Sequence, residues 1–217
     1  MDHARDENRK VTPDERRHHI LDVAHRAFIR DGYAGASMSR IAAEVGGSKT
    51  TLYNYFDSKK DLFVAVTERE TARLLDEVFV VEPEGGDFKS RVVELTRRML
   101  AAMLTDDMVE SYRMIVAEAG RFPEIGVTAY DMAIERGISR FAAYFERAMD
   151  EGLLRRTDAT CAAEQLIALA SGMLMRKRVW NVIPSVSPQT IAEEALRITQ
   201  TFLAAFGNDA LSGAARA

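Results

Sequence analysis

Apolar residues recur at spacings of three and four along most of this chain, which is the period of a helix that buries one face. From Phe88 onward no stretch alternates between apolar and polar residues as a half-buried strand would. Glycine or proline residues separate most of the periodic stretches, as expected for turns between helices. The pattern predicts an all-α protein of about nine helices.

The first periodic stretch begins with three agreeing signals for the start of a helix. Thr12 can act as the N-cap, Pro13 fills the first helical position, and Glu15 can complete a capping box with Thr12. One apolar stripe follows, and Asp31-Gly32 ends it. We interpret this stretch as a packing helix whose buried face is formed by Ile20, Val23, Ala24, Ala27 and Phe28.

Residues 37–56 hold two short helical patterns separated by Gly46 and Gly47, where a left-handed residue is needed to end the first helix. Ser37 or Ser39 can cap the first helix, and Ser48 can cap the second. This arrangement predicts a helix-turn-helix. The apolar sides of its two helices are formed by Ile41, Ala42 and Val45, and by Leu52, Tyr55 and Phe56.

The exposed side of the second short helix is rich in hydrogen-bond donors, which a helix lying in a phosphate-walled groove requires. This side carries Lys49, Thr50, Thr51, Tyr53 and Asn54. The run Gly47-Ser48-Lys49-Thr50 also resembles the end of a phosphate-binding loop. Such a loop needs glycine directly before the lysine and again five residues earlier, where this chain has Ser48 and Ala43. We therefore do not expect nucleotide binding at this turn.

A long helix from about Lys59 to Val80 is expected next, because Ser58 and Asp61 can form a second capping box. The stretch 82–87 combines a proline with paired glycines and is the clearest break in the chain. We expect a basic arm at 1–11, a helix-turn-helix domain at 12–66, a helical domain at 67–206 and a flexible tail at 207–217. The arginines of the arm could reach DNA, and a solvated tail is the alternative.

The last two helical patterns, at about 158–173 and 187–202, carry apolar residues at alternating spacings of three and four, as in the seam of a helix bundle. Such a pair can bury its seam against a two-fold mate and form a four-helix interface. The alternative is that the seam only closes the core of one chain. The candidate dimer interface consists of Leu166, Leu169, Met173, Ile191, Ala195, Ile198 and Phe202.

Methionines and aromatic residues are the candidate lining of a ligand pocket in the second domain, because methionine suits adaptable apolar sites. The set consists of Met99, Met103, Met114, Phe122, Tyr130, Met173 and Trp180. A stripe of methionines at helical spacing can equally be plain core. The run Arg176-Lys177-Arg178 could bind an anionic ligand or could complete the C-terminus of a helix.

Composition sets further bounds on this chain of 217 residues. A content of 47% hydrophobic and 29% charged residues is ordinary for a globular protein. The single cysteine, Cys161, excludes an internal disulfide framework, and a reducing, cytoplasmic setting fits best. The N-terminus is too polar for a secretory signal, and no apolar run is long enough to cross a membrane. The histidines of the first helix lack partners for a metal site, so we expect neither a metal nor a cofactor.

Charge is unevenly distributed along the chain. The first 70 residues hold 12 basic and 12 acidic side chains, so the whole net charge of -4 comes from the rest of the chain. Basic residues gather near the chain start, and Lys49, Lys59 and Lys60 surround the second short helix. The acidic average is therefore compatible with DNA binding by the first domain.

The first four helices resemble the N-terminal domain of the TetR/AcrR family of transcriptional regulators. The resemblance runs from Ile20 to about Val66, and it is carried by Ala24, Phe28, Gly32-Tyr33, Ser37, Ile41-Ala42, Gly46, Ser48-Lys49, Leu52-Tyr53, Tyr55-Phe56 and Lys59. The chain departs from the family at Gly47, where an aliphatic residue is usual, and Asn54 stands at a position that varies with operator preference.

The resemblance implies a set of DNA contacts. Ser37, Ser39 and Arg40 would approach the DNA backbone and the edge of the groove. The recognition helix would consist of Ser48, Lys49, Thr50, Thr51, Tyr53, Asn54 and Tyr55. Lys59 would bind a phosphate, and Tyr55 would be partly structural. The residue types agree, since lysine suits phosphates, threonine suits thymine or backbone, and asparagine can pair with adenine.

The stretch 118–124, Glu-Ala-Gly-Arg-Phe-Pro-Glu, is similar to one found in AefR-like members of that family. This resemblance implies that the second domain forms the dimer and holds a pocket for an effector, here a small and largely apolar molecule. The sequence as a whole predicts a homodimeric, ligand-responsive repressor that binds a palindromic operator in double-stranded DNA and catalyses no reaction. The alternatives are an enzyme with an incidental helix-turn-helix and a helical adaptor that does not bind DNA.

Overall fold

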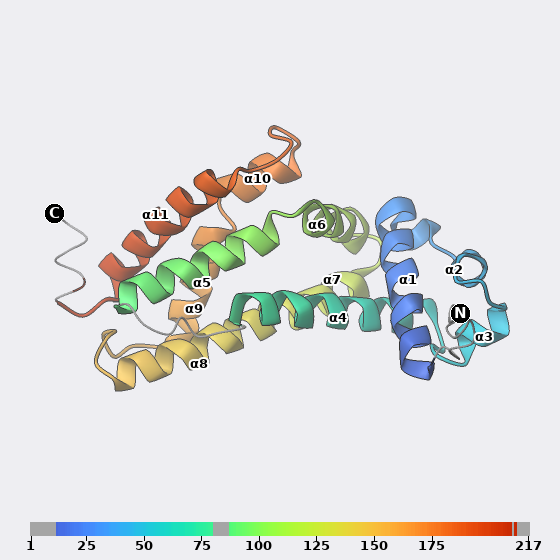
Figure 1. Ribbon diagram of the computed structural model, residues 1–217, viewed down its shortest axis with the longest axis horizontal. Coiled ribbons are helices and arrows are strands. Elements are labelled where there is room, and N and C mark those ends of the chain that lie inside the picture. Colours follow the sequence, from blue (N-terminus) through green and yellow to red (C-terminus); the bar gives the residue numbers. More distant parts are fainter. Residues whose placement is uncertain (1–11, 80–86, 210, 212–217) are drawn as a thin grey trace, which may run out of the picture. The chain divides into compact units, whose positions relative to one another are not determined.

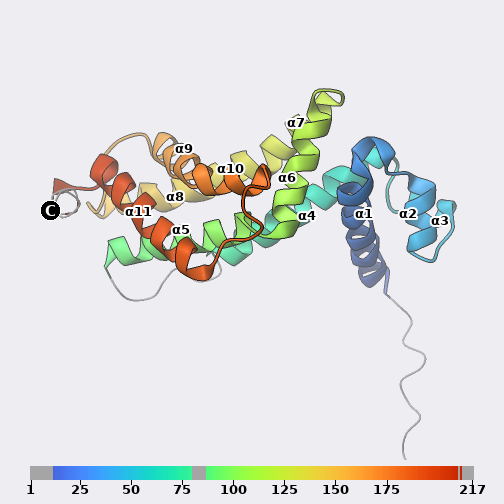
Figure 2. The same cartoon turned by 90° about the horizontal axis from the view of Figure 1, so that it is seen from above.

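The computed structural model describes residues 12–79, 87–209 and 211, and its regular elements are helices (Figure 1, Figure 2). An isolated β-bridge joins Leu154 and Gly207. The prediction of an all-α fold is confirmed. The expected arm at 1–11, most of the break at 82–87 and most of the tail at 207–217 lie outside the described residues. The chain divides into two compact units between Thr67 and Glu68, which we call unit 1 and unit 2.

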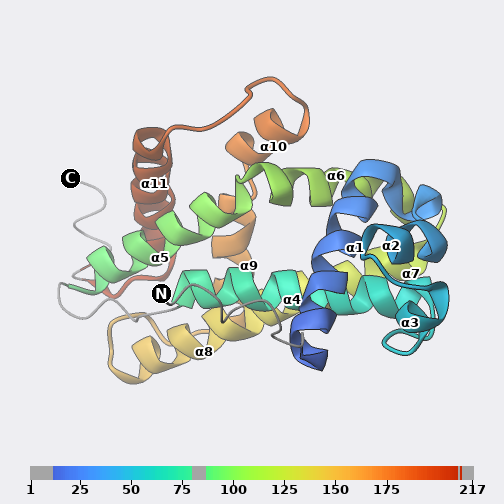
Figure 3. The ribbon, with the colours of Figure 1, turned by 45° about the vertical axis from the view of Figure 1, so that its right-hand side comes forward.

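Unit 1 contains α1 (Pro13–Gly35), α2 (Met38–Glu44), α3 (Lys49–Tyr53) and the start of α4 (Lys59–Phe79). Figure 3 shows α2 and α3 as two short neighbouring helices beside α1. The expected capping box of α1 is present, because the Thr12 side chain accepts from the Glu15 amide and the Glu15 carboxylate accepts from the Thr12 amide. Gly46 ends α2 with a φ of 72°, as its place in the turn predicts.

The core of unit 1 is formed by the apolar stripe of α1 and by the inner faces of the three shorter elements. Phe28, Ile41, Leu52 and Leu62 are each at most 2% exposed, and burial of one such side chain stabilises the fold by roughly 1.5–3 kcal/mol. The rings of Phe28, Tyr33 and Phe63 pack together with centroid distances of 5.4–5.9 Å. This core holds α2 and α3 in place, although each is too short to be stable alone.

Unit 2 contains seven further α-helices and one π-helix among the described residues. They are α5 (Phe88–Met103), α6 (Asp106–Ala119), α7 (Pro123–Ala129), η1 (Tyr130–Glu135), α8 (Arg136–Asp150), α9 (Ala159–Ala170), α10 (Met173–Val179) and α11 (Pro188–Phe206). α5 packs along α11, and α8 packs along α9 (Figure 2). Phe145 and Phe202 stack at the centre of the core with their ring centroids 4.8 Å apart.

Most of the predicted dimer seam lies inside the core of unit 2. Leu166, Ala195, Ile198 and Phe202 are each at most 4% exposed, and Leu169 and Ile191 are half-buried against the same core. Met173, at 62% exposure, is the exception within the predicted set. These side chains are buried because α9 and α11 pack against each other, α11 packs against α5, and α9 packs against α8.

Two segments of unit 2 differ from the periodic pattern. The helix expected to run to Met173 ends at Ala170, and Ser171 and Gly172 separate it from α10. The helix expected from Ile134 onward is preceded without interruption by α7 and by the π-helical segment η1. None of the six residues of η1 is buried.

Candidate nucleic-acid interface

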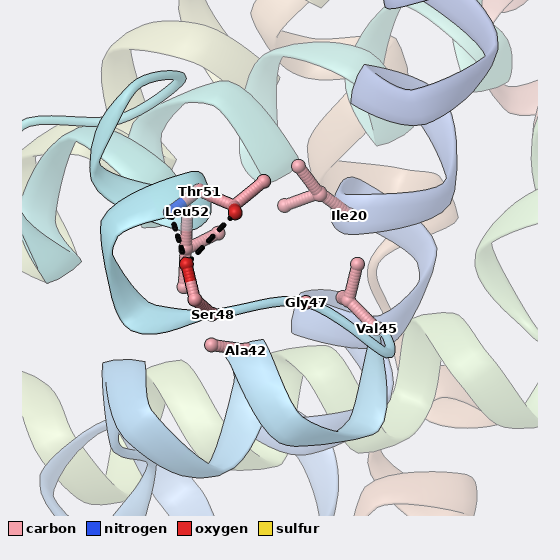
Figure 4. Close-up of a pocket in the computed structure, with 7 residues that line it drawn as sticks. All are labelled: Ile20, Ala42, Val45, Gly47, Ser48, Thr51 and Leu52. Atoms are coloured by element: carbon pink, nitrogen blue, oxygen red, sulfur yellow. Dashed lines mark hydrogen bonds between the residues drawn. The ribbon is translucent and has the colours of Figure 1, made fainter. Parts of the chain in front are cut away.

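The short helix α3 is fixed at its start by a side-chain cap and in its middle by a buried leucine. The Ser48 hydroxyl accepts from the Thr51 amide at 3.0 Å and also shares a hydrogen bond with the Thr51 hydroxyl at 2.9 Å (Figure 4). Leu52 is 2% exposed and anchors the helix to the core. Because the Ser48 cap and Leu52 both lie on one side of α3, the other side is left for a partner.

The outward side of α3 carries four exposed polar or amphipathic side chains, Lys49, Thr50, Tyr53 and Asn54. The Lys49 ammonium lies 5.7 Å from the centre of the Tyr53 ring, a cation–π distance that orders both side chains. Thr51 is half-buried because its hydroxyl serves the cap. Tyr55 is also half-buried, which agrees with the partly structural part expected of it.

The first turn of α2 contributes Ser37, Ser39 and Arg40. Ser37 caps α2 by accepting from the Arg40 amide at 3.2 Å, so its hydroxyl has a structural task. Ser39 and Arg40 are exposed. The Arg40 guanidinium contacts the Asp31 carboxylate at 3.1 Å. The hydrogen bond from Arg30, aided by that from Arg40, lowers the pKa of Asp31 to about 2, so this carboxylate stays ionised at neutral pH.

Lys59, which the resemblance predicts to bind a phosphate, is half-buried beside the end of α1. Its ammonium donates to the carbonyl oxygens of Tyr33, Ala36 and Ala34 at 2.7, 3.1 and 3.3 Å. An ammonium has three N–H donors, and three acceptors already surround this one. The sequence could not show this arrangement, because the carbonyls come from a different helix.

Two arginines of α1 that were not among the predicted contact residues lie beside the helix-turn-helix. Arg16 donates from Nη2 to the carbonyl oxygen of Gly46 at 3.5 Å. The guanidinium of the exposed Arg17 lies 5.5 Å from the centre of the Phe56 ring. The cluster of basic residues near the chain start was the available signal, but only the packing of α1 shows that the pair reaches the turn and the end of α3.

A narrow crevice lies between α1 and the helix-turn-helix (Figure 4). It is too narrow to hold a water molecule, and it is lined by Ile20, Ala42, Val45, Gly47, Ser48, Thr51 and Leu52. A Cβ atom added to Gly47 would lie 3.6 Å from the Thr51 Cβ and 3.0 Å from the Arg16 guanidinium. The aliphatic side chain that is usual in the family at the position of Gly47 is therefore missing from this turn.

The predicted effector-binding residues lie on several helices of unit 2 and differ widely in burial. Met99 is 4% exposed within the core, and Met103, Met114 and Phe122 are half-buried. In contrast, Tyr130, Met173 and Trp180 are exposed by 51%, 62% and 74%. Helical spacing placed these residues on faces of their helices without showing which faces meet.

The basic run at the end of α10 has a structural task at one of its three positions. Arg178 is 4% exposed, pairs with Asp106 at 2.5 Å and also donates to the carbonyl of Pro184. The Arg113 guanidinium of α6 donates to the carbonyl oxygens of Arg178 and Val179 at 2.6 and 2.8 Å. Arg113 therefore caps the C-terminus of α10, while Arg176 and Lys177 remain exposed.

The residues described here include no group of three His, Cys, Asp or Glu side chains that could hold a metal ion. Within the same residues, no helix is both long and apolar enough to span a bilayer.

A capped helix-turn-helix with a polar outer face, followed by a helical unit, defines a transcriptional regulator of the helix-turn-helix class. Residues 20–66 match the model of the bacterial regulatory proteins of the tetR family. Residues 90–208, more than half of the chain, match the model of the AefR-like transcriptional repressor C-terminal domain. The chain belongs to the TetR family, and its second unit is of the AefR-like type.

Curated helix-turn-helix regulators are similar to two fifths of the chain. The HTH-type transcriptional repressor AcnR of Corynebacterium diphtheriae is 36% identical over 86 residues, which cover 40% of this chain and 40% of AcnR. An uncharacterized HTH-type transcriptional regulator of Mycobacterium tuberculosis is 40% identical over 86 residues, which cover 40% of this chain and 39% of that protein. The matches thus span about two fifths of the length of these curated relatives.

Solved structures resemble nearly the whole chain. A putative TetR-family transcriptional regulator of Mesorhizobium loti has a TM-score of 0.81 and 26% identity over 92% of this chain and 100% of its own. The flavonoid-responsive regulator FrrA has a TM-score of 0.77 and 28% identity over 90% of this chain and 99% of its own. Both units therefore have counterparts in one known fold.

Proposed function

We propose that this protein is a transcriptional repressor that reads a palindromic operator with α3 and changes its affinity when a small molecule binds to unit 2. The observation that carries the proposal is the division of α3 into a buried side anchored by Leu52 and an outward side formed by Lys49, Thr50, Tyr53 and Asn54. In the major groove, lysine would meet phosphates or guanine, and asparagine would pair with adenine.

We expect a homodimer because α3 is short. A helix of five residues can reach only a few base pairs, and two copies about one helical turn apart double the contacts on one face of the duplex. Because most of the predicted seam is buried within the chain, we expect exposed apolar side chains of unit 2 to make the contacts between chains. Met173, Trp180, Val182 and Leu196 are such side chains.

A response to a ligand is proposed from family membership and from the name of FrrA, a flavonoid-responsive regulator. That description belongs to FrrA, and the effector of this protein is proposed only as a small and largely apolar molecule. A repressor of this kind acts where the genome is, so we place it in the cytoplasm.

The proposal is tested by selecting bound duplexes from a random pool and titrating the selected operator by fluorescence anisotropy at several salt concentrations. Native protein should bind a two-fold symmetric site with an affinity that falls steeply with salt. Lys49→Ala should reduce the log-log salt slope by about 0.9 if its charge neutralises one phosphate. The exposed Lys177 of α10 provides the control, since Lys177→Ala should leave the slope unchanged. A helical adaptor would show no salt-dependent binding to any duplex, and that result would refute the proposal.

A further inference from the structure

A cluster of charged side chains joins the end of α1 to α2. Its members are Arg30, Asp31, Arg40 and Glu44. Arg30 donates from Nε and Nη2 to the two carboxylate oxygens of Asp31 at 3.0 and 2.8 Å, and its Nη2 also lies 2.9 Å from a carboxylate oxygen of Glu44. A bidentate contact of this kind fixes the orientation of a carboxylate. Arg30 therefore holds Asp31 in place by itself.

Arg40 contacts the same carboxylate from α2, with its Nη1 atom 3.1 Å from Asp31 Oδ2. That oxygen already accepts from Arg30 Nη2. The side chain of Arg40 is 60% exposed, whereas that of Asp31 is 15% exposed. An ion pair with so exposed a member adds little to the stability of a fold. The Arg40 guanidinium can therefore leave Asp31 for another anion without unfolding unit 1.

The position of Arg40 in the fold determines which anion it would meet. α2 is the first helix of the helix-turn-helix, and in this motif the first helix crosses the DNA backbone while the second enters the major groove. A guanidinium binds a phosphate through the same fork of donors with which it binds a carboxylate. A DNA phosphate and the Asp31 carboxylate are therefore alternative partners of Arg40.

The charges of the cluster oppose this exchange of partners. Its two guanidinium groups and two carboxylates sum to zero. When Arg40 moves to a phosphate, the remaining three side chains carry one net negative charge beside the DNA backbone, and like charges repel. We propose that Asp31 restrains DNA binding, because its carboxylate competes with a DNA phosphate for Arg40. This inference rests on the proposed function and adds to it a residue that sets the affinity for the DNA backbone.

Three substitutions isolate the competition. Asp31→Asn removes the carboxylate charge and keeps nearly the same shape. Glu44→Gln is the matched control, because it removes the same charge from the same cluster at a carboxylate that contacts Arg30. Arg40→Gln removes the group for which Asp31 and the phosphate compete, and it is combined with each of the other two.

The measurement is a fluorescence-anisotropy titration of the full chain with a labelled duplex of random sequence at low salt and with the selected operator. Asp31→Asn should bind the duplexes about two- to five-fold more tightly than Glu44→Gln does, which is the range expected of an exposed ion pair. The excess should be the same on both duplexes, because phosphate contacts carry no sequence information. It should vanish when Arg40→Gln is present. Equal affinities of Asp31→Asn and Glu44→Gln, or an excess that persists without Arg40, would overturn the competition.

A structural role of Asp31 has the opposite sign. If Asp31 held α2 against α1, then Asp31→Asn would loosen α2 and weaken DNA binding. Amide hydrogen exchange of the DNA-free chain tests this role, and we expect the exchange rates in α2 to change by less than about two-fold. Faster exchange together with weaker binding would reject the proposal. Native protein that bound neither duplex would refute the proposed function itself, whereas native binding without the Asp31 excess would refute only the competition.

Discussion

A methyl group at position 47 should stabilise the helix-turn-helix. Gly47 is half-buried, and it is not among the glycines with positive φ, so an alanine can adopt its backbone conformation. A new Cβ would make ordinary contacts with Thr51 at 3.6 and 3.7 Å. Its close neighbour is the Arg16 guanidinium at 3.0 Å, the far end of a flexible side chain.

The magnitude follows from three contributions. Replacing glycine by alanine at a compatible position stabilises a fold by about 0.4–1 kcal/mol through the unfolded chain. Burial of the methyl group adds at most about 0.8 kcal/mol. Displacing Arg16 costs little, because its hydrogen bond to Gly46 is long at 3.5 Å. We expect Gly47→Ala to raise the free energy of unfolding of unit 1 by about 1 kcal/mol.

Native-state hydrogen exchange of the amides in α2 and α3 measures this free energy locally, and it avoids assuming that both units unfold together. A gain of about 1 kcal/mol slows exchange through the unfolded state by roughly five-fold. The matched control is Gly46→Ala. A Cβ on Gly46 would meet nothing within 4 Å, but its φ of 72° is left-handed, so this change should cost about 1–2 kcal/mol.

The reasoning about Gly47 would be refuted by one combination of results. If Gly46→Ala destabilises the unit as expected while Gly47→Ala leaves exchange unchanged or faster, then the space beside Gly47 cannot accept a side chain. In that case the Arg16 guanidinium would be a fixed part of the turn.

Three further predictions concern separate parts of the chain. The hydrogen bond from Arg97 is the main cause that lowers the pKa of Glu94 from 4.5 to about 2. The ionised carboxylate therefore stabilises the fold above about pH 4.5, and this stabilisation is lost as the pH falls toward 2. In urea titrations at stepped pH, the free energy of unfolding of Glu94→Gln should fall less steeply over this range than that of the native protein. Arg113→Met should lower the free energy of unfolding of unit 2 by about 1–3 kcal/mol, because it leaves the end of α10 uncapped, whereas Arg176→Met at an exposed position of the same helix should change a thermal melt little. Arg17→Ala should reduce the salt slope of operator binding by up to about 0.9, and an unchanged slope would place Arg17 outside the interface.

Local signals in the sequence were sufficient for the first unit. The Thr12 capping box, the caps at Ser37 and Ser48 and the positive φ of Gly46 depend on residues within a few positions of one another. Such signals act through local hydrogen bonds and backbone preference. The helix-turn-helix and its outward side could therefore be placed before any packing was known.

Other side chains of the predicted sites have surroundings that depend on distant parts of the chain. Periodicity shows that α9 and α11 bury one face, but it does not show whether the covering surface belongs to the same chain, as it does for Leu166 and Phe202. The position of Lys59 suggested a solvent-exposed cation, and its three acceptors lie 23 to 26 residues earlier in the sequence. Neither outcome could be read from spacing alone.

The π-helical segment η1 has a consequence for insertions and deletions in this chain. An α-helix turns about 100° per residue, so Ala129 of α7 and Ile138 of α8, both buried, would face opposite sides of one continuous α-helix. A π turn holds about one residue more than an α turn and rotates the two buried faces back toward one side. Deleting the exposed Ala133 should convert η1 to α-helix and keep both faces in register, whereas deleting a residue within α8 should rotate Phe145 out of the core. Relatives that lack this extra residue should therefore align with a single-residue gap between 130 and 135.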